Sequence, residues 1–382
     1  MDVSSPRGVE VSRHPCWPEL PHVAREPDNR YALAPEVGPE SVDLLVDEDL
    51  FTERYGPVLL QAWYFALAPG GVARVRRHES PAAFRARFPA AAAKFAVARD
   101  GAHLTLTKGR PALRPGDTID RWSFGIPTNH ARPEWLERCI DAIEAQGIPE
   151  FEVILCGTYN GPLRPGVRFI DFKERDDLGW ITRKKNLLCA AARYDNLAIL
   201  HDRIVLDPGW FAGMKRYGNY FEALGCAVVN AAGGREADWV TWGAPLWLGS
   251  RQGLLAHDDW DPFVYLDGAF CALKRSVWEA HPWDEDYYWR EGEDVALSHA
   301  MTRAGVVIRF NPDARCLSLA SKAPLPLHPR DPSLRGPRPV PAGPYSARHL
   351  RDDGARAGIA ALRALGLYRP VKELAARLRR RA

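Results

Sequence analysis

The sequence contains no CxxC pair, although it has seven cysteines. Their scattered positions and odd number give no support to a zinc site or to a disulfide framework. Several lie within apolar runs, so we expect reduced core cysteines in a cytoplasmic protein. The seven are Cys16, Cys139, Cys156, Cys189, Cys226, Cys271 and Cys316.

Long hydrophobic runs are also absent. No apolar stretch reaches the roughly 18 residues that a membrane span needs. The opening "MDVSSPRGVEVSRHPCWPEL" lacks the apolar region of a secretory signal, so we expect no signal peptide. A formal net charge of +3 is small for 382 residues and predicts no nucleic-acid partner.

What is present is a globular composition, with 46% hydrophobic and 26% charged residues. The length suffices for about two domains of ~150 residues. We expect a loose N-terminal arm at 1–30, a small α/β domain at 31–118 and a larger domain at 119–322. A Pro-rich connector and basic C-terminal helices would occupy 323–382. The stretch "LRPGDTIDR" (Leu113–Arg121) would separate the two domains, because Pro, Gly and Asp break regular structure.

The first domain carries the helical stretch "YGPVLLQAWYFAL", the turn "LAPGG" and the strand "VARVRR". This order resembles the second half of a class I S-adenosylmethionine methyltransferase, over residues 41–110 only. No GxGxG follows a strand here, so the resemblance implies a truncated fold without a cofactor loop. A small α/β domain unrelated to methyltransferases is an equally good interpretation.

The second domain alternates apolar strands with amphipathic helices. "WSFGIPT", "FEVILCG", "VRFIDF" and "LAILHD" have strand character, and "ARPEWLERCIDAIEAQG" and "TRKKNLLCAAARY" have helical spacing. Such alternation predicts a mostly parallel sheet with helices on both faces. Parallel sheets bind ligands at the carboxyl ends of their strands. The polar trio His201, Asp202 and Arg203 follows one such strand and therefore predicts a ligand site, although His201 and Arg203 could also simply cap the strand.

The ordered motifs "GIPTNHARPEWLERCIDAI", "GWITRKKNLLCAAA", "LAILHDR" and "LDGAFCALKRSVW…WREGEDVAL" resemble the GT-A glycosyltransferases, in particular the family-2-like group, from Trp122 to Leu319. The resemblance implies a GT-A fold, Rossmann-like and mostly parallel, and transfer of a sugar from a nucleotide-sugar donor to a small-molecule or glycan acceptor. Two departures stand out. The second strand ends in Cys156 and Gly157 instead of acids, and the family's DxD motif is replaced by His-Asp-Arg.

The resemblance places the donor diphosphate at the ends of these strands. It implies that Asp202, assisted by His201, holds Mg²⁺ or Mn²⁺. Arg203 could instead bind phosphate oxygens and replace the metal in part, so metal independence stays open. The basic "RKKN" turn (Arg183–Asn186) stands at a helix start, where it would suit a bound phosphate. The competing interpretation is a solvated basic turn without a ligand. The donor-binding residues expected are Pro127, Thr128, Asn129, Arg183, Lys184, Arg203, Asp267 and Gly268.

The acceptor side is expected at "WREGED". By its position in the resembling motif, Asp294 would be the catalytic base and Glu293 would hold an acceptor hydroxyl. Acids at a helix start are favourable without any function, which is the competing interpretation. Tryptophans gather between the motifs, and we expect Trp242 and Trp289 to contact the acceptor, since sugars stack on indoles.

The sequence therefore predicts an inverting glycosyltransferase. The alternative is a non-catalytic nucleotide- or sugar-binding protein derived from one. A nucleotidyltransferase is disfavoured because no Gly- and Arg-containing loop follows the first strand of the larger domain. The basic end "KELAARLRRRA" fits either weak peripheral contact with an anionic membrane or a solvated helix.

Overall fold

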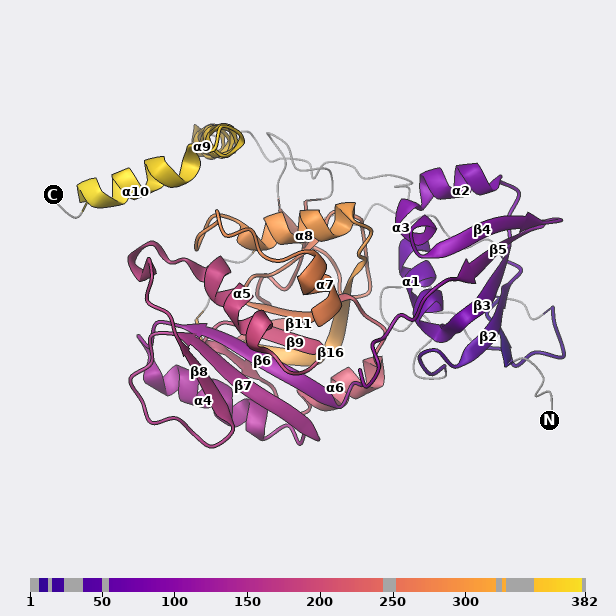
Figure 1. Ribbon diagram of the computed structural model, residues 1–382, viewed down its shortest axis with the longest axis horizontal. Helices are drawn as coiled ribbons and strands as arrows, with labels where there is room; N and C mark the ends of the chain where they lie inside the picture. Colours follow the sequence, from indigo (N-terminus) through magenta and orange to yellow (C-terminus); the bar gives the residue numbers. More distant parts are fainter. Residues whose placement is uncertain are drawn as a thin grey trace.

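The computed structural model describes residues 7–12, 16–23, 37–49, 55–242, 252–320, 325–327 and 347–379. Figure 1 shows a smaller N-terminal unit beside a larger one, with the last two helices lying along the larger unit. The predicted connector falls mostly outside the described residues. None of the described helices is long and apolar enough to cross a membrane.

The N-terminal unit is a five-stranded sheet in the order β1-β2-β3-β5-β4. Its strands β1, β2 and β3 pair in parallel, and the β3–β5 and β4–β5 pairs are antiparallel. The bounds are β1 (Gly8–Glu10), β2 (Val42–Asp47), β3 (Leu67–Arg76), β4 (Phe95–Asp100), β5 (His103–Lys108), α1 (Gly56–Ala66), α2 (Pro81–Arg87) and α3 (Pro89–Ala92). The resemblance to half a methyltransferase stays a prediction.

Part of the expected loose arm, residues 7–12 and 16–23, is among the described residues. Gly8–Glu10 forms β1 beside β2, and the Glu10 side chain is fully buried. Its carboxylate accepts hydrogen bonds from the backbone N–H groups of Cys16 (2.8 Å) and Trp17 (2.9 Å). These bonds satisfy a buried charge and fix the segment, an effect that the Pro-rich composition did not reveal.

The larger unit contains an eight-stranded sheet in the order β10-β16-β11-β15-β9-β6-β7-β8. Strands β6, β7, β8, β9, β11 and β16 run in one direction, and β10 and β15 run in the other. This confirms the predicted α/β class with a mostly parallel sheet. The bounds are β6 (Arg121–Thr128), β7 (Glu150–Gly157), β8 (Val167–Asp171), β9 (Asn196–Leu200), β10 (Ile204–Leu206), β11 (Ala223–Asn230), β15 (Phe270–Lys274) and β16 (Ile308–Ser318).

Helices cover both faces of this sheet, as Figure 1 shows, and a small sheet in the order β13-β12-β14 stands beside it. One apolar cluster packs under α4, whose buried residues recur at three- and four-residue spacing, and the other packs under α5 and α8. The remaining bounds are α4 (Pro133–Glu144), α5 (Ile181–Ala191), α6 (Trp210–Tyr217), α7 (Arg275–Ala280), α8 (Glu293–Arg303), β12 (Trp239–Thr241), β13 (Gly253–Leu254), β14 (Val264–Leu266) and the 3₁₀ turn Asp176–Leu178. Six of the cysteines are buried as expected, whereas Cys16 is exposed.

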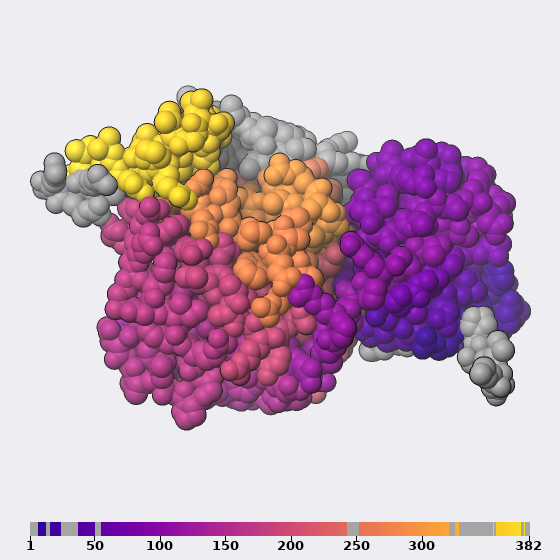
Figure 2. All heavy atoms as spheres, in the orientation of Figure 1, coloured from indigo at the N-terminus to yellow at the C-terminus, as the bar shows by residue number. Residues whose placement is uncertain are grey.

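The last two helices, α9 (Ala347–Ala364) and α10 (Tyr368–Arg379), form the predicted C-terminal pair. The break between them falls at Gly366, whose φ is 67°, and Pro370 lies in the first turn of α10. Proline is tolerated there because first-turn N–H groups have no helical acceptor. The pair lies over the larger unit (Figure 2), where Lys372 and Arg363 form ion pairs with Glu291.

A buried charge fixes the start of the larger unit. The side chain of Lys274, at the end of β15, donates to Asp117 (2.8 Å), Asn196 (2.6 Å) and Asn219 (2.5 Å). Asp117 belongs to the segment that precedes β6, and both charged side chains are almost fully buried. The bond therefore ties the entry of the chain to the middle of the sheet.

We predict that Lys274→Ala destabilises the protein by about 3–5 kcal/mol, because Asp117 would remain buried without its cation. Urea unfolding monitored by tryptophan fluorescence measures this loss. Arg114→Ala is the control, since its ion pair with Glu279 is about 40% exposed on both sides and should contribute less than about 1 kcal/mol. Equal losses of unfolding free energy in the two variants would contradict the stabilising role of the buried Lys274–Asp117 pair.

Candidate active site

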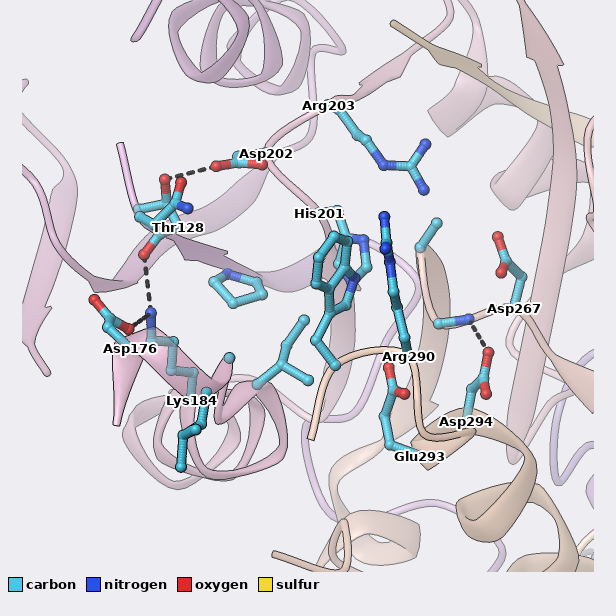
Figure 3. A pocket seen from close by; sticks show the side chains of 18 of the residues that line it. Thr128, Asp176, Lys184, His201, Asp202, Arg203, Asp267, Arg290, Glu293 and Asp294 are labelled. Atoms are coloured by element: carbon cyan, nitrogen blue, oxygen red, sulfur yellow. Dashed lines mark hydrogen bonds and ion pairs between the residues drawn. The ribbon is translucent and has the colours of Figure 1, made fainter. Parts of the chain in front are cut away.

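A cavity of about 710 Å³ opens at the carboxyl ends of β6 and β9 and at the start of α8. Its volume lies in the range of small-molecule sites, about 300–1,000 Å³. Figure 3 shows several of its polar side chains. The lining residues are Pro127, Thr128, Asn129, Asp176, Asp177, Leu178, Gly179, Ile181, Lys184, His201, Asp202, Arg203, Asp267, Gly268, Ala269, Trp289, Arg290, Gly292, Glu293 and Asp294.

Asp202 lies on one side of the cavity, just after β9. The Thr128 hydroxyl, at the end of the neighbouring strand β6, donates to Asp202 Oδ2 at 2.7 Å. Burial raises the pKa of Asp202, and the Thr128 hydrogen bond and the charges of Arg203 and Lys184 oppose that rise. The adjacent β6 and β9 thus present a hydroxyl and a carboxylate together at one edge of the sheet.

Lys184, in the first turn of α5, joins this edge to a loop. Its buried ammonium group donates to the Thr128 carbonyl at 3.2 Å and forms an ion pair with Asp176 at 2.5 Å. The Thr158 hydroxyl also donates to Asp176, at 3.0 Å. Figure 3 shows Lys184 between Thr128 and Asp176.

Gly157 ends β7 where the glycosyltransferase resemblance led us to look for an acid. Its φ is 135°, and a Cβ atom there would lie 1.9 Å from the Thr128 carbonyl oxygen and 2.8 Å from Lys184 Nζ. Only glycine lets the two strand ends approach this closely. The departure from an acidic strand end therefore has a steric cause.

The opposite side of the cavity carries Glu293 and Asp294, at the start of α8. Lys185 Nζ lies 3.4 Å from Glu293 Oε1 and donates to the Gly268 carbonyl at 3.1 Å. Asp294 instead accepts from two backbone N–H groups, those of Gly268 (2.9 Å) and Val295 (2.8 Å). Burial, followed by the negative charges of Glu293 and Asp267, raises the pKa of Asp294 to about 6.

Two arginines enter the cavity between these sides. Arg203 Nη1 donates to Ser318 Oγ (2.6 Å) and to the Ala320 carbonyl (3.3 Å). The Arg290 guanidinium lies 4.2 Å from the centre of the Trp289 ring, and its backbone φ is 67°. In Figure 3 both arginine side chains are drawn between Asp202 and Asp267.

The cavity lining includes twelve of the fourteen residues that the sequence singled out and leaves out Arg183 and Trp242. Arg183 is not among the lining residues, and its guanidinium group pairs with Glu285 at 3.0 Å. Trp242 is buried in a separate apolar cluster against Tyr265. Trp289 does line the cavity and is 52% exposed.

Two parts of the lining were not predicted from the sequence. The segment Asp176–Gly179 reaches the cavity through a turn flanked by Arg175 and Gly179, both at positive φ. The letters "RDDLGW" directly before the basic turn were a usable signal, since acids commonly pair with nearby cations. Arg290 was the other omission, although "WREG" stood beside the predicted base.

Among the described ranges, no group of three or more His, Cys, Asp or Glu side chains is arranged to hold a metal ion. His201 and Asp202 both line the cavity, and Asp202 is the one carboxylate at the end of β9. The Mg²⁺ or Mn²⁺ site stays a prediction.

No known family model and no curated protein matches the sequence. The structure is similar to that of GalNAc-T7 with UDP, GalNAc and Mn²⁺, at a TM-score of 0.41 and 14% identity, over 53% of this chain and 44% of that one. It is also similar to residues 1–349 of TarS from S. aureus, at a TM-score of 0.38 and 11% identity, over 52% of this chain and 60% of that one. Both are GT-A glycosyltransferases, the fold predicted for 119–322, and this chain spans less than two thirds of either. At these identities the likeness concerns the fold alone.

We predict that Gly157→Ala destabilises the protein by more than 2 kcal/mol, roughly the upper cost of a left-handed backbone alone. The added Cβ would meet the Thr128 carbonyl and push it away from Lys184. Urea unfolding measures the loss. Gly166→Ala is the matched control, because Gly166 also has a positive φ (82°) but no atom within 4 Å of the added Cβ. A loss no larger than the control's would refute the steric argument.

Proposed function

We propose that the chain is a glycosyltransferase that moves a sugar from a nucleotide-sugar donor to an acceptor nucleophile, with inversion. The observation that carries the proposal is that Asp202 and Asp294 line one cavity, although they come from the end of β9 and the start of α8. The donor diphosphate would lie toward Asp202, Thr128 and Lys184. The acceptor would lie toward Asp294, with Trp289 offering an exposed ring for stacking.

The reaction needs a base and groups that stabilise the negative charge that develops on the leaving diphosphate. An acceptor hydroxyl oxygen attacks the anomeric carbon as the bond from that carbon to the diphosphate oxygen breaks. Asp294 takes the hydroxyl proton, and the departing nucleoside diphosphate keeps the bonding electron pair. Positive groups around that leaving oxygen stabilise the charge that develops on it.

Asp294 suits the base better than Glu293 does. The Glu293 carboxylate already faces the buried ammonium of Lys185. Asp294 has backbone amides as its hydrogen-bond donors, and its pKa of about 6 makes it a stronger base than an ordinary aspartate while leaving it ionised at pH 7. Glu293 then orients the acceptor and raises the pKa of its neighbour.

We predict that Asp294→Asn lowers sugar transfer by about 10²–10⁴-fold, because the amide cannot accept the proton. Thermal shifts with UDP, GDP, dTDP and CDP identify the nucleotide that binds, and the corresponding nucleotide-sugars are then assayed for transfer or hydrolysis. Nucleotide binding should survive the substitution, since Asp294 lies on the acceptor side. Asp284→Asn, in the exposed loop before α8, is the control and should keep full turnover.

The same assay separates the alternative function. A non-catalytic binding protein would bind a nucleotide without turning over any of the nucleotide-sugars. A wild-type protein that behaves in this way, under metal-free conditions and with Mg²⁺ or Mn²⁺, would replace the enzymatic proposal. Loss of turnover in the Asp284→Asn control would show that the effect is not specific to the base.

We further predict that kcat/KM falls as the pH is lowered through about 6, since protonation of Asp294 removes the base. This fall in kcat/KM should be visible in the pH profile of the wild-type protein between pH 5 and 8. Donor binding, followed by thermal shift over the same range, should change much less. A flat profile down to pH 5 would contradict the role of Asp294.

A further inference from the structure

The donor side of the cavity offers a poor set of ligands for a divalent cation. Mg²⁺ requires octahedral oxygen coordination, and sites of this kind use one or two carboxylates beside the phosphates. Asp202 is the one acid at the end of β9, and its Oδ2 already accepts from Thr128. Asp176 is engaged by Lys184 and Thr158. Its position is thus fixed by a cation rather than kept open for one.

The cavity lining contains three cationic side chains, namely Lys184 on the donor side and Arg203 and Arg290 between the two sides. Lys184 has Asp176 as its counter-ion. Within the part of the chain that the structure describes, neither Arg203 nor Arg290 has a carboxylate in an ion pair with it. Two guanidinium groups that line one cavity without a carboxylate in an ion pair favour an anion beside them. A diphosphate supplies that anion, and guanidinium groups bind phosphate oxygens in bidentate fashion.

The backbone holds Arg290 in place at an energetic cost. A φ of 67° is unfavourable for a residue that is not glycine, asparagine or aspartate. Hydrogen bonds on both sides keep this conformation. The Trp289 N–H donates to the Gly179 carbonyl at 2.9 Å, and the Glu291 N–H donates to the Tyr288 carbonyl at 3.1 Å. Strain retained in this way is typical of functional sites, and here it directs a guanidinium into the cavity.

We propose that Arg203 and Arg290, rather than a divalent cation, bind the donor diphosphate, and that the reaction does not require a metal. This inference rests on the proposed function for the identity of the anion. It adds Arg290 as a residue that touches the leaving group. The role of Lys184 is then to hold Thr128 and Asp176 in place at the edge of the site.

Inorganic pyrophosphate is the probe, because it tests the anion site without a choice of base or sugar. Isothermal titration calorimetry in EDTA should detect its binding to the wild-type protein. Arg290→Asn, which keeps a residue suited to positive φ, should weaken binding about 10- to 100-fold, the value of one or more charged hydrogen bonds. Arg290→Lys should give an intermediate affinity. Arg203→Gln should weaken binding as well.

Arg99→Asn is the matched control, since it removes one exposed arginine from β4 of the N-terminal sheet and should leave pyrophosphate binding unchanged. Binding that occurs only with added Mn²⁺ would overturn the proposal. So would equal affinities for Arg290→Asn and Arg99→Asn. Circular dichroism and urea unfolding of each variant confirm that a loss of binding is not a loss of fold.

The activity assay keeps the two proposals apart. Turnover of a nucleotide-sugar in EDTA, lowered by Arg290→Asn and unchanged by Arg99→Asn, would support both. Turnover that requires Mn²⁺ would leave the transferase function standing and overturn the metal-free diphosphate site. Pyrophosphate binding in EDTA without any turnover would support the anion site and count against the transferase.

Discussion

The site depends on the contact between Lys184 and the end of β6. The ammonium group joins the Thr128 carbonyl to Asp176, while the Thr128 hydroxyl holds Asp202. A sheet edge, a helix start and a loop are thereby fixed by one buried cation. The contact is possible because Gly157 leaves room for the Thr128 carbonyl. A carboxylate in that place would interact with Lys184 but would force the strand ends apart.

Both cationic and acidic side chains line the cavity, and their distribution suits the proposed transfer between unlike partners. In the proposed reaction the cations would face the diphosphate, whereas Glu293, Asp294 and Asp267 would lie where the acceptor loses a proton. Burial, followed by the negative charges of Glu293 and Asp267, raises the pKa of Asp294 to about 6. A cation next to Asp294 would lower its pKa and weaken it as a base. The charge of Lys185 opposes the rise in that pKa, but its ammonium group contacts Glu293 and the Gly268 carbonyl rather than Asp294.

The periodic features of the sequence predicted the fold well, because apolar spacing reports directly on which face of a strand or helix is buried. The sequence also predicted that Asp202 and Asp294 share one cavity, as they do in the structure. The prediction was possible because strand ends and helix starts converge at one edge of such a sheet. It was harder to predict which individual side chains face the cavity. Arg183 and Lys184 are adjacent on α5 and point about 100° apart, so "RKKN" alone did not reveal which of them faces the cavity. Arg290 depends on a backbone conformation that no spacing rule predicts.

Backbone strain concentrates around the cavity. Four described residues other than glycine have positive φ, and three of them, His130, Arg175 and Arg290, are in the lining or adjacent to it. Such conformations persist only where the surroundings over-determine them. Part of that support comes from the end of the chain, since Glu373 of α10 pairs with Arg175 at 2.9 Å and Lys372 pairs with Glu291, the neighbour of Arg290. Among the described side chains, none from α9 or α10 lines the cavity, so these helices support the site through the loops that they contact.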